Sequence, residues 1–413
     1  MDRPRRLHDT LTVLLVPSLV AHPVAGAATA LAWAWTARPP RWVIDARLLA
    51  PIGIAAVVIA VHAPQDPGGS AWLFLSLAVA AWLTATWRGT LNARDAGLLG
   101  LGASGAAAVL GVVAAVQSIA TGFSQVHPGA SHPNIAAGLG LALVGASAAA
   151  ARLPRWGTTT AAVGIASALV LVTLTGSRGG WIGMAVGAVV VGASIVIGRT
   201  AAGTHRLAAA TALGLTLVLL VGLQVVAFAP AGLTTRPADA IVTTGVAVDP
   251  GRDAPLGDRL ASLLDVWRGT GGRVATWTVA RQLVAERPWL GYGFASALPV
   301  FRAEAASSLM VPTHHPHNGA LLVLLQGGAV LLTAVALLLL GWLWPLAASG
   351  IAGDRVSVIV LGAISALVAV DRFDQVLVRG DVAAVALVAV LAVLARPPRP
   401  LRLPAETSGS VVR

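Results

Sequence analysis

The chain has 413 residues, of which 56% are hydrophobic and only 11% are charged, and its mean hydropathy is +0.80. Soluble domains carry roughly 25% charged residues, so this composition excludes a soluble globular protein and indicates a polytopic membrane protein. The net charge of +11 comes from arginine alone, which is typical of cytoplasmic loops and does not indicate nucleic-acid binding, and the absence of cysteine excludes disulfides and thiolate metal sites.

Apolar runs of about 20 residues, long enough to cross roughly 30 Å of hydrocarbon as a helix, recur along the whole chain. They lack the alternation of a β-barrel, so we expect an all-α helical bundle that forms a single membrane domain over residues 1–413. We predict about eleven transmembrane helices, within a range of ten to twelve. They cover residues 10–35, 47–63, 70–87, 96–121, 133–151, 157–175, 180–198, 207–229, 319–344, 356–371 and 381–395.

Arginine-rich connections should lie in the cytoplasm, because cytoplasmic loops of membrane proteins carry the positive excess. These connections hold Arg38, Arg41, Arg47, Arg88, Arg94, Arg152, Arg155, Arg199 and Arg206, and the tail holds Arg396, Arg399 and Arg402. The connections 64–69 and 122–132 contain no arginine. Together with Ser177–Arg178, the loop 230–318 and Asp371–Arg372, they are therefore expected on the outer face.

The first segment conflicts with this topology. Eleven spans leave Arg3, Arg5 and Arg6 outside, against the same rule. Residues 10–35 contain Pro17, Pro23 and Gly26, so the segment is alternatively broken or re-entrant, or it resembles a signal peptide.

Glycines in one later span indicate close helix packing. Gly179, Gly183 and Gly187 are four residues apart and therefore share one helix face. In membranes such a smooth ridge lets a neighbouring helix approach closely, so we interpret these glycines as a packing surface rather than a site.

Residues 230–318 are too many for a simple connection, and we expect them to form one large extracytoplasmic loop between two spans. Arg273 to Glu286 within this loop has the pattern of an amphipathic helix, with Trp277, Ala280 and Val284 on one face. Pro288 and the turn Gly291-Tyr292-Gly293 are expected to end that helix.

Histidine and arginine residues gather at the predicted outer boundary. The segment His314-His315-Pro316-His317-Asn318 holds three of the nine histidines and stands directly before the span 319–344. The arginines at this boundary are Arg178, Arg273, Arg281 and Arg287. Arginine matches phosphate oxygens bidentately, and histidine exchanges protons near neutral pH, so this set suits transfer from a lipid-phosphate leaving group to a hydroxyl.

Structural interpretations of the same residues stay open. Arg178 alternatively reaches interfacial phosphates, the loop arginines are alternatively solvated helix charges, and His317 alternatively serves only in hydrogen bonding. A zinc site fits worse, because neighbouring positions in an extended chain point in opposite directions and the segment offers no carboxylate. We therefore expect neither a metal nor a cofactor.

Four short blocks follow one another between about residues 120 and 345. They are His132-Pro133-Asn134-Ile135-Ala136; Thr175-Gly176-Ser177-Arg178-Gly179-Gly180; Arg273-Val274-Ala275-Thr276-Trp277 with Arg287-Pro288-Trp289-Leu290-Gly291-Tyr292-Gly293; and His315-Pro316-His317-Asn318 with Gln326-Gly327-Gly328. In this order and spacing the blocks resemble the O-antigen ligase family, which includes O-antigen polymerases and bacterial protein O-oligosaccharyltransferases.

The resemblance implies metal-independent transfer of a glycan from an undecaprenyl-pyrophosphate carrier to an acceptor hydroxyl, on the outer face of the cytoplasmic (inner) membrane. The implied partners are this lipid-linked donor, a glycan, lipid or protein acceptor, and the bilayer. The implied catalytic residues are His317, as general base or acceptor-orienting group, and Arg273, which with Arg178 would hold the pyrophosphate. The predicted substrate-binding residues are Arg178, His315, Asn318, Trp277 and Arg287.

Two other functional classes remain open. A multi-pass transporter or flippase of lipid-linked or small solutes would place charges near mid-membrane, within discontinuous helices and repeated halves. Here the charges lie at span ends and in one loop, and no internal repeat is evident. A catalytically idle scaffold for envelope assembly would tolerate loss of His317 and Arg273.

Overall fold

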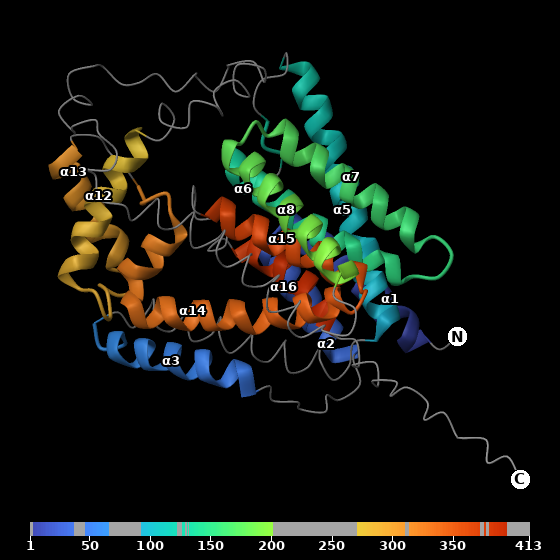
Figure 1. Cartoon of the computed structure of the whole chain (residues 1–413), viewed down its shortest axis with the longest axis horizontal. Coiled ribbons are helices and arrows are strands. Elements are labelled where there is room, and N and C mark those ends of the chain that lie inside the picture. Colours follow the sequence, from blue (N-terminus) through green and yellow to red (C-terminus); the bar gives the residue numbers. More distant parts are fainter. Residues whose placement is uncertain are drawn as a thin grey trace, which may run out of the picture.

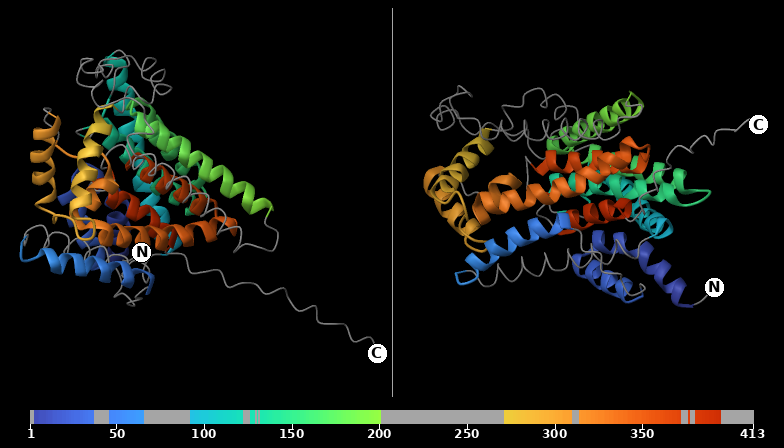
Figure 2. Two further views of the ribbon diagram at one scale, coloured as in Figure 1. Left: turned by 60° about the vertical axis from the view of Figure 1, so that its left-hand side comes forward. Right: turned by 60° about the horizontal axis from the view of Figure 1, so that its bottom comes forward.

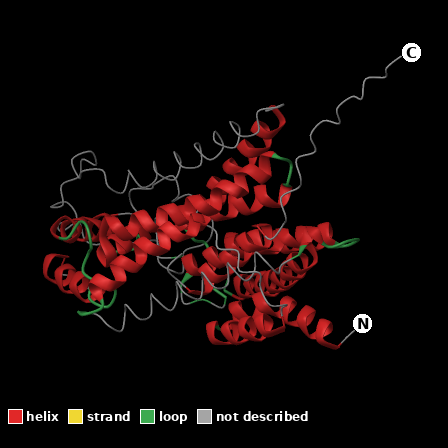
Figure 3. Ribbon diagram, turned by 90° about the horizontal axis from the view of Figure 1, so that it is seen from below, coloured by secondary structure: helices red, strands yellow, loops and turns green. Residues whose placement is uncertain are grey.

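The computed structural model describes residues 3–36, 46–65, 92–121, 126–128, 130, 132–200, 271–309, 314–371, 376 and 380–394. Every regular element in these ranges is a helix, which confirms the predicted all-α class (Figures 1 and 3). The elements are α1 (Arg3–Ala21), α2 (Pro23–Thr36), α3 (Ala46–His62), α5 (Ala93–Ala120), α6 (Pro133–Ala148), the short 3₁₀ helix η1 (Ala149–Arg152), α7 (Gly157–Leu174), α8 (Arg178–Thr200), α12 (Gly271–Glu286), α13 (Ala297–Leu309), α14 (Gly319–Ile351), α15 (Arg355–Asp371) and α16 (Gly380–Leu394).

Five of the described helical segments are long and apolar enough to cross a membrane. They are α5, α6 together with η1, α7, α8 and α14, and α3 and α16 contain shorter apolar stretches. The predicted spans 70–87 and 207–229, and residues 230–270 of the predicted outer loop, lie outside the described residues. The count of eleven spans and the extent of the loop therefore stay predictions.

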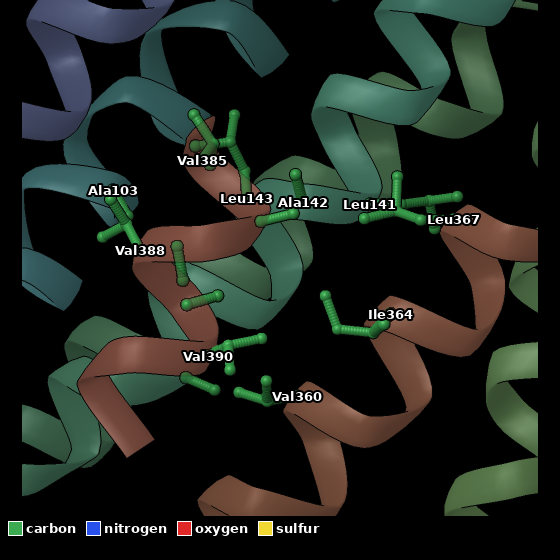
Figure 4. Packing of buried hydrophobic residues seen from close by; sticks show 14 of the residues in the cluster. Ala103, Leu141, Ala142, Leu143, Val360, Ile364, Leu367, Val385, Val388 and Val390 are labelled. Carbon is green, nitrogen blue, oxygen red and sulfur yellow. The ribbon is translucent and has the colours of Figure 1, made fainter. Parts of the chain in front are cut away.

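The main core lies where α6 passes between α15 and α16 (Figure 4). Leu143 of α6, Ile364 of α15 and Val390 of α16 are almost completely buried there. Buried residues make up 89% of the α6 segment but only 33% of α7 and of α8. A helix that is apolar all round and buried all round is central, whereas α7 and α8 leave apolar side chains facing outward, as lipid contact requires.

The predicted glycine ridge packs against a helix, as expected. A Cβ on Gly183 would lie 2.9 Å from the Ala366 carbonyl oxygen of α15, and one on Gly187 would lie 2.9 Å from the Gly362 carbonyl oxygen. Both distances are too short for a real Cβ, so these glycines let the backbones of α8 and α15 touch.

The bundle has two distinguishable ends. At the first, Arg152 of η1 donates to Asp354 before α15 at 3.3 Å and to the Ala392 carbonyl of α16, and Ala150 lies against Gly100 near the start of α5. We call this the arginine end. At the opposite end, the histidine end, α6, α8 and α14 begin and α15 ends. Arg94 at the start of α5, Arg155 between η1 and α7, and Arg199 in the last turn of α8 also lie toward the arginine end.

The N-terminal segment differs from the single span predicted over residues 10–35. α1 and α2 are separated only by His22 and fold back on each other, with Trp33 Nε1 donating to Thr12 Oγ1 at 2.8 Å. His8 near the start of α1 lies 3.1 Å from Thr36 at the end of α2. The helical hairpin therefore has both ends on one side. Its two dark-blue helices lie beside each other near the N-terminus in the right view of Figure 2. Pro23 begins α2 directly after this break, whereas Pro17 lies within α1 and Gly26 lies within α2, where it contacts Leu19 of α1.

The hairpin also corrects the predicted position of the N-terminus. Arg94 Nη2 lies 2.6 Å from Asp9 Oδ2, so the start of α1 is tied to the start of α5 at the arginine end. Arg5 and Arg6 thus lie with the other arginines rather than opposite them, and the conflict with the positive-inside rule disappears.

Candidate functional site

The histidine segment forms a fixed turn at the start of α14. Asn318 is fully buried and caps the helix, with its Oδ1 accepting from the Leu321 amide at 3.0 Å. His317 has a φ of 50°, a left-handed conformation that non-glycine residues rarely adopt. Its ring lies 4.0 Å, centroid to centroid, from that of His315. The turn therefore brings the two predicted histidines together.

His314 differs from the two histidines that follow it. Its side chain is exposed, and its contact is through the backbone: Arg302 Nε of α13 donates to the His314 carbonyl at 3.0 Å. Arg302 thus anchors the beginning of the histidine turn, while Asn318 anchors its end. Neither α13 nor this role of Arg302 was predicted from the sequence.

Asp371, the last residue of α15, joins the site from another helix. Its carboxylate occupies the space in which a Cβ on Gly319 would lie. A negative charge is thereby placed at the first turn of α14, where the helix dipole favours it, two residues from His317. The sequence placed Asp371 on the outer face but gave no signal that it meets the histidine turn, because the two are more than fifty residues apart.

The block Thr175 to Gly180 turns the chain from α7 into α8. Thr175 Oγ1 donates to the Val172 carbonyl at 2.7 Å, and Gly176 has a φ of 61°. Ser177 Oγ then accepts from the Gly180 amide at 2.9 Å, as an N-cap does. Arg178 is the first residue of α8 and is half-buried. An anion bound there would meet both the guanidinium and the positive end of a helix dipole.

The block His132 to Ala136 supports the turn between α7 and α8. His132 caps α6, with its Nδ1 accepting from the Asn134 amide at 3.2 Å. Asn134 is buried, and its Oδ1 accepts a short hydrogen bond from Ser177 Oγ. The starts of α6 and α8 are therefore linked side chain to side chain, and this link fixes the position of Arg178.

The loop helix predicted over Arg273–Glu286 is present as α12; of its predicted apolar face, Trp277 and Ala280 are buried and Val284 is half-buried. Trp277 is 4% exposed and Ala280 is fully buried, against Phe301 of α13 and Leu325 of α14. Trp277 therefore contributes mainly to this core. Arg273 is half-buried in the first turn of α12.

Arg281 and Arg287 each contact a residue that lies within five positions in the sequence. Arg281 Nη2 donates to Thr278 Oγ1 at 3.1 Å, and burial lowers the pKa of Arg281. Arg287 is exposed and stacks on the Tyr292 ring at 4.8 Å. The histidine turn and Asp371 thus gather at the start of α14, while Arg178 and Arg273 lie on two other helices.

A family model described as O-antigen ligase matches residues 161–336. This segment belongs to the O-antigen ligase family. It contains all seven predicted site residues, whereas Asp371 and the helices α1 to α6 lie outside it. A search of curated proteins gives no match.

Two glycine-containing blocks of the O-antigen ligase segment, residues 287–293 and 326–328, contact each other at a break in α14. An unbroken helix would bond the amides of Ala329 and Val330 to the carbonyls of Leu325 and Gln326. Here those amides donate to Pro288 and Trp289, at 2.8 and 3.2 Å, because Gly328 breaks the helix with a φ of 63°.

The two freed carbonyls are satisfied by the same segment. Leu325 accepts from the Tyr292 amide at 2.7 Å, and Gln326 accepts from the Gly293 amide at 3.0 Å. We call this pairing of residues 288–293 with residues 325–330 the α14 interlock. The glycines of these blocks thus serve a close backbone contact, and the interlock fixes the end of α12 against α14.

Within the described ranges, no three histidine, aspartate or glutamate side chains are grouped closely enough to hold a metal ion. The chemistry that this arrangement offers is proton exchange at the histidine pair and anion binding at arginines and helix starts.

Proposed function

We propose that this chain transfers a glycan from an undecaprenyl-pyrophosphate carrier to an acceptor hydroxyl, at the outer face of the cytoplasmic membrane. The observation that carries the proposal is the histidine turn: within an O-antigen ligase segment, His315 and His317 are in ring contact at a buried, capped helix start. The arginine end then faces the cytoplasm, and the histidine end faces outward.

His317 acts as the general base. The bond between the glycan C1 and the pyrophosphate oxygen breaks while C1 bonds to the acceptor oxygen, and the hydroxyl proton passes to the imidazole. The carboxylate of Asp371 at the first turn of α14 stabilises the imidazolium that forms. His315 orients His317 through their ring contact, and Asn318 fixes the turn. General-base catalysis of this kind contributes typically about 10²- to 10⁴-fold.

Arg178 and Arg273 hold the pyrophosphate and neutralise the charge that develops as the glycan leaves. Arg178 is suited to this role because the start of α8 adds its own positive dipole. Arg287, exposed at the end of α12, binds further out on the substrate. The reaction proposed in this way uses no metal and no cofactor, since proton transfer and charge neutralisation are both assigned to side chains.

One feature of the structure is also typical of transporters: α14 is a discontinuous helix. In transporters the freed backbone groups at such a break bind substrate or ions. In α14 they are bonded to the protein's own residues 288–293 instead. The break is therefore part of the packing and does not favour a solute site.

The test is glycan transfer from a purified undecaprenyl-pyrophosphate-linked donor pool in proteoliposomes, with a chelator present throughout. We expect wild-type transfer to persist and His317→Ala and Arg273→Ala to lose about 10²-fold or more while staying folded. His314→Ala is the matched control, since that side chain is exposed and only its backbone is bonded, and it should retain activity. If all four proteins move donor across the bilayer equally and none forms product, the transporter function replaces this one.

A further inference from the structure

One donor of the α14 interlock comes from a helix far away in the sequence. His62, the last residue of α3, is 4% exposed, and its Nε2 lies 2.6 Å from the Leu290 carbonyl oxygen. A carbonyl oxygen only accepts, so Nε2 carries the hydrogen. His62 therefore bonds the segment 288–293 at Leu290, which lies between the two pairs of backbone bonds to α14.

Five backbone groups of this segment thus bond to α14 or to His62. The Pro288 and Trp289 carbonyls accept from α14, the Leu290 carbonyl accepts from His62, and the Tyr292 and Gly293 amides donate to α14. A backbone carbonyl that loses its donor costs about as much as a lost hydrogen bond, so the bond from His62 adds to the four backbone bonds between this segment and α14.

Side-chain packing ties α3 to both partners of the interlock. Ala55 and Val58 of α3 are buried together with Leu331 and Ala334 of α14, and Leu290 packs against the same cluster. The His62 ring also meets Phe294 edge-on at 6.3 Å. α3 thus holds α14 and the segment 288–293 in one arrangement.

We propose that His62 is a positioning residue, which closes the α14 interlock and so holds α12, with Arg273, in place for the transfer reaction. The proposal rests on the proposed function for its kinetic consequence, but not for its structural one. The segment 288–293 follows α12 with one residue between them, so displacement of the segment displaces the helix. Misplacement of a substrate-binding group by about 1 Å lowers a rate by up to about 100-fold.

The bond to Leu290 determines which substitutions of His62 should preserve the α14 interlock. Glutamine at position 62 offers an amide N–H at about the reach of Nε2, whereas leucine fills similar space without a donor. His62→Gln should therefore restore what His62→Leu loses. His22→Leu, at the exposed turn between α1 and α2, is the control for loss of a histidine elsewhere.

The experiment measures amide hydrogen exchange and steady-state transfer on the full-length variants in the same proteoliposomes. We expect His62→Leu to speed exchange at least tenfold in peptides covering 288–294 and 325–331, with α7 peptides unchanged. Its kcat should fall about tenfold or more at nearly constant KM. His62→Gln and His22→Leu should match the wild type in both measurements.

Three results would overturn the proposal. They are unchanged exchange in the interlock peptides of His62→Leu, equally faster exchange in all its peptides, and failure of His62→Gln to restore local protection. If the wild type forms no product, the proposed function fails, while the exchange result still decides whether His62 holds the interlock.

Discussion

Gly328 of α14 lies directly against the backbone of Trp289, so that a Cβ at position 328 would overlap the Trp289 carbonyl group. The φ of 63° and ψ of −162° at Gly328 are also open almost only to glycine. We expect Gly328→Ala to destabilise the protein by about 3 kcal/mol or more, because clash and backbone strain add. Thermal unfolding in detergent measures the loss.

Gly105→Ala is the matched control for this substitution. Gly105 lies in α5 with open space where a Cβ would be, so alanine there should be neutral or stabilise by up to about 1 kcal/mol. Equal unfolding temperatures for the two variants would contradict the interlock geometry.

Tyr292 is the single tyrosine of the chain, so its titration can be followed directly. Burial and the 2.6 Å hydrogen bond to Glu286 raise its pKa to about 12. Because the folded-state pKa lies above the ordinary value, the stabilising contact is complete below about pH 10 and is lost as the pH rises through about 12.

Phenolate absorbance near 295 nm measures this titration in the folded protein. We expect a wild-type midpoint near 12 and a lower midpoint in Glu286→Gln, which removes the carboxylate charge but leaves the burial that also raises the pKa of Tyr292. Ser307→Ala, on the exposed face of α13, should leave the midpoint unchanged. A wild-type midpoint near 10 would show that Tyr292 does not bond Glu286.

Features that depend on neighbouring residues could be predicted from the sequence, whereas contacts between distant helices could not. Helices such as α5 and α12 were predictable, because apolar length and periodicity are local properties of the chain. The turn of His315 to Asn318 was located correctly because its residue types are unusual at a span start. The contact of Asp371 with Gly319 and the bond of His62 to Leu290 depend on how distant helices meet, which no local pattern encodes.

The glycine blocks could be found in the sequence, but their structural role could not be predicted from it. Gly291 and Gly328 were recognisable as family features, but their physical role, the replacement of two helix bonds by four bonds to another segment, needs both backbones in place. The hairpin of α1 and α2 also depends on contacts that the sequence alone does not reveal. Pro17 and Pro23 indicate a break, but the return of the chain is decided by contacts such as Trp33 with Thr12.

The contact between Gly319 and Asp371 predicts a coupled pair of substitutions. Gly319→Ala should displace the carboxylate and destabilise the fold, while Asp371→Ala should remove the obstacle. In a double-mutant cycle we expect the second substitution to relieve the first, with a coupling of about 1–3 kcal/mol. Additive losses in thermal unfolding would mean that the two residues do not touch.

A substitution of Asp371 alone distinguishes its role in packing from its role in catalysis. Asp371→Asn keeps the shape of the side chain but removes its charge, so we expect stability close to the wild type and glycan transfer reduced about tenfold or more. Asp354→Asn, at the arginine end, changes a carboxylate far from the histidine turn and should leave kcat unchanged once folding is confirmed.

The N-terminal hairpin predicts which side of the membrane residue 5 faces. The chain contains no cysteine, so a single introduced cysteine reports its own accessibility without background. Trp156→Cys, exposed between η1 and α7, marks the arginine end, and Ser308→Cys, exposed on α13, lies on the segment expected outside. Because Asp9 pairs with Arg94, Arg5→Cys should behave as Trp156→Cys does.

Labelling of whole cells with a membrane-impermeant maleimide shows on which side of the membrane each introduced cysteine lies. We expect Ser308→Cys to react in intact cells, and Arg5→Cys and Trp156→Cys to react only after the membrane is permeabilised. Reaction of Arg5→Cys in intact cells would restore the single N-terminal crossing, since an uninterrupted span over residues 10–35 carries Arg5 to the outer face. Reaction of Trp156→Cys in intact cells would instead invert the whole bundle, and the histidine turn would then face the cytoplasm.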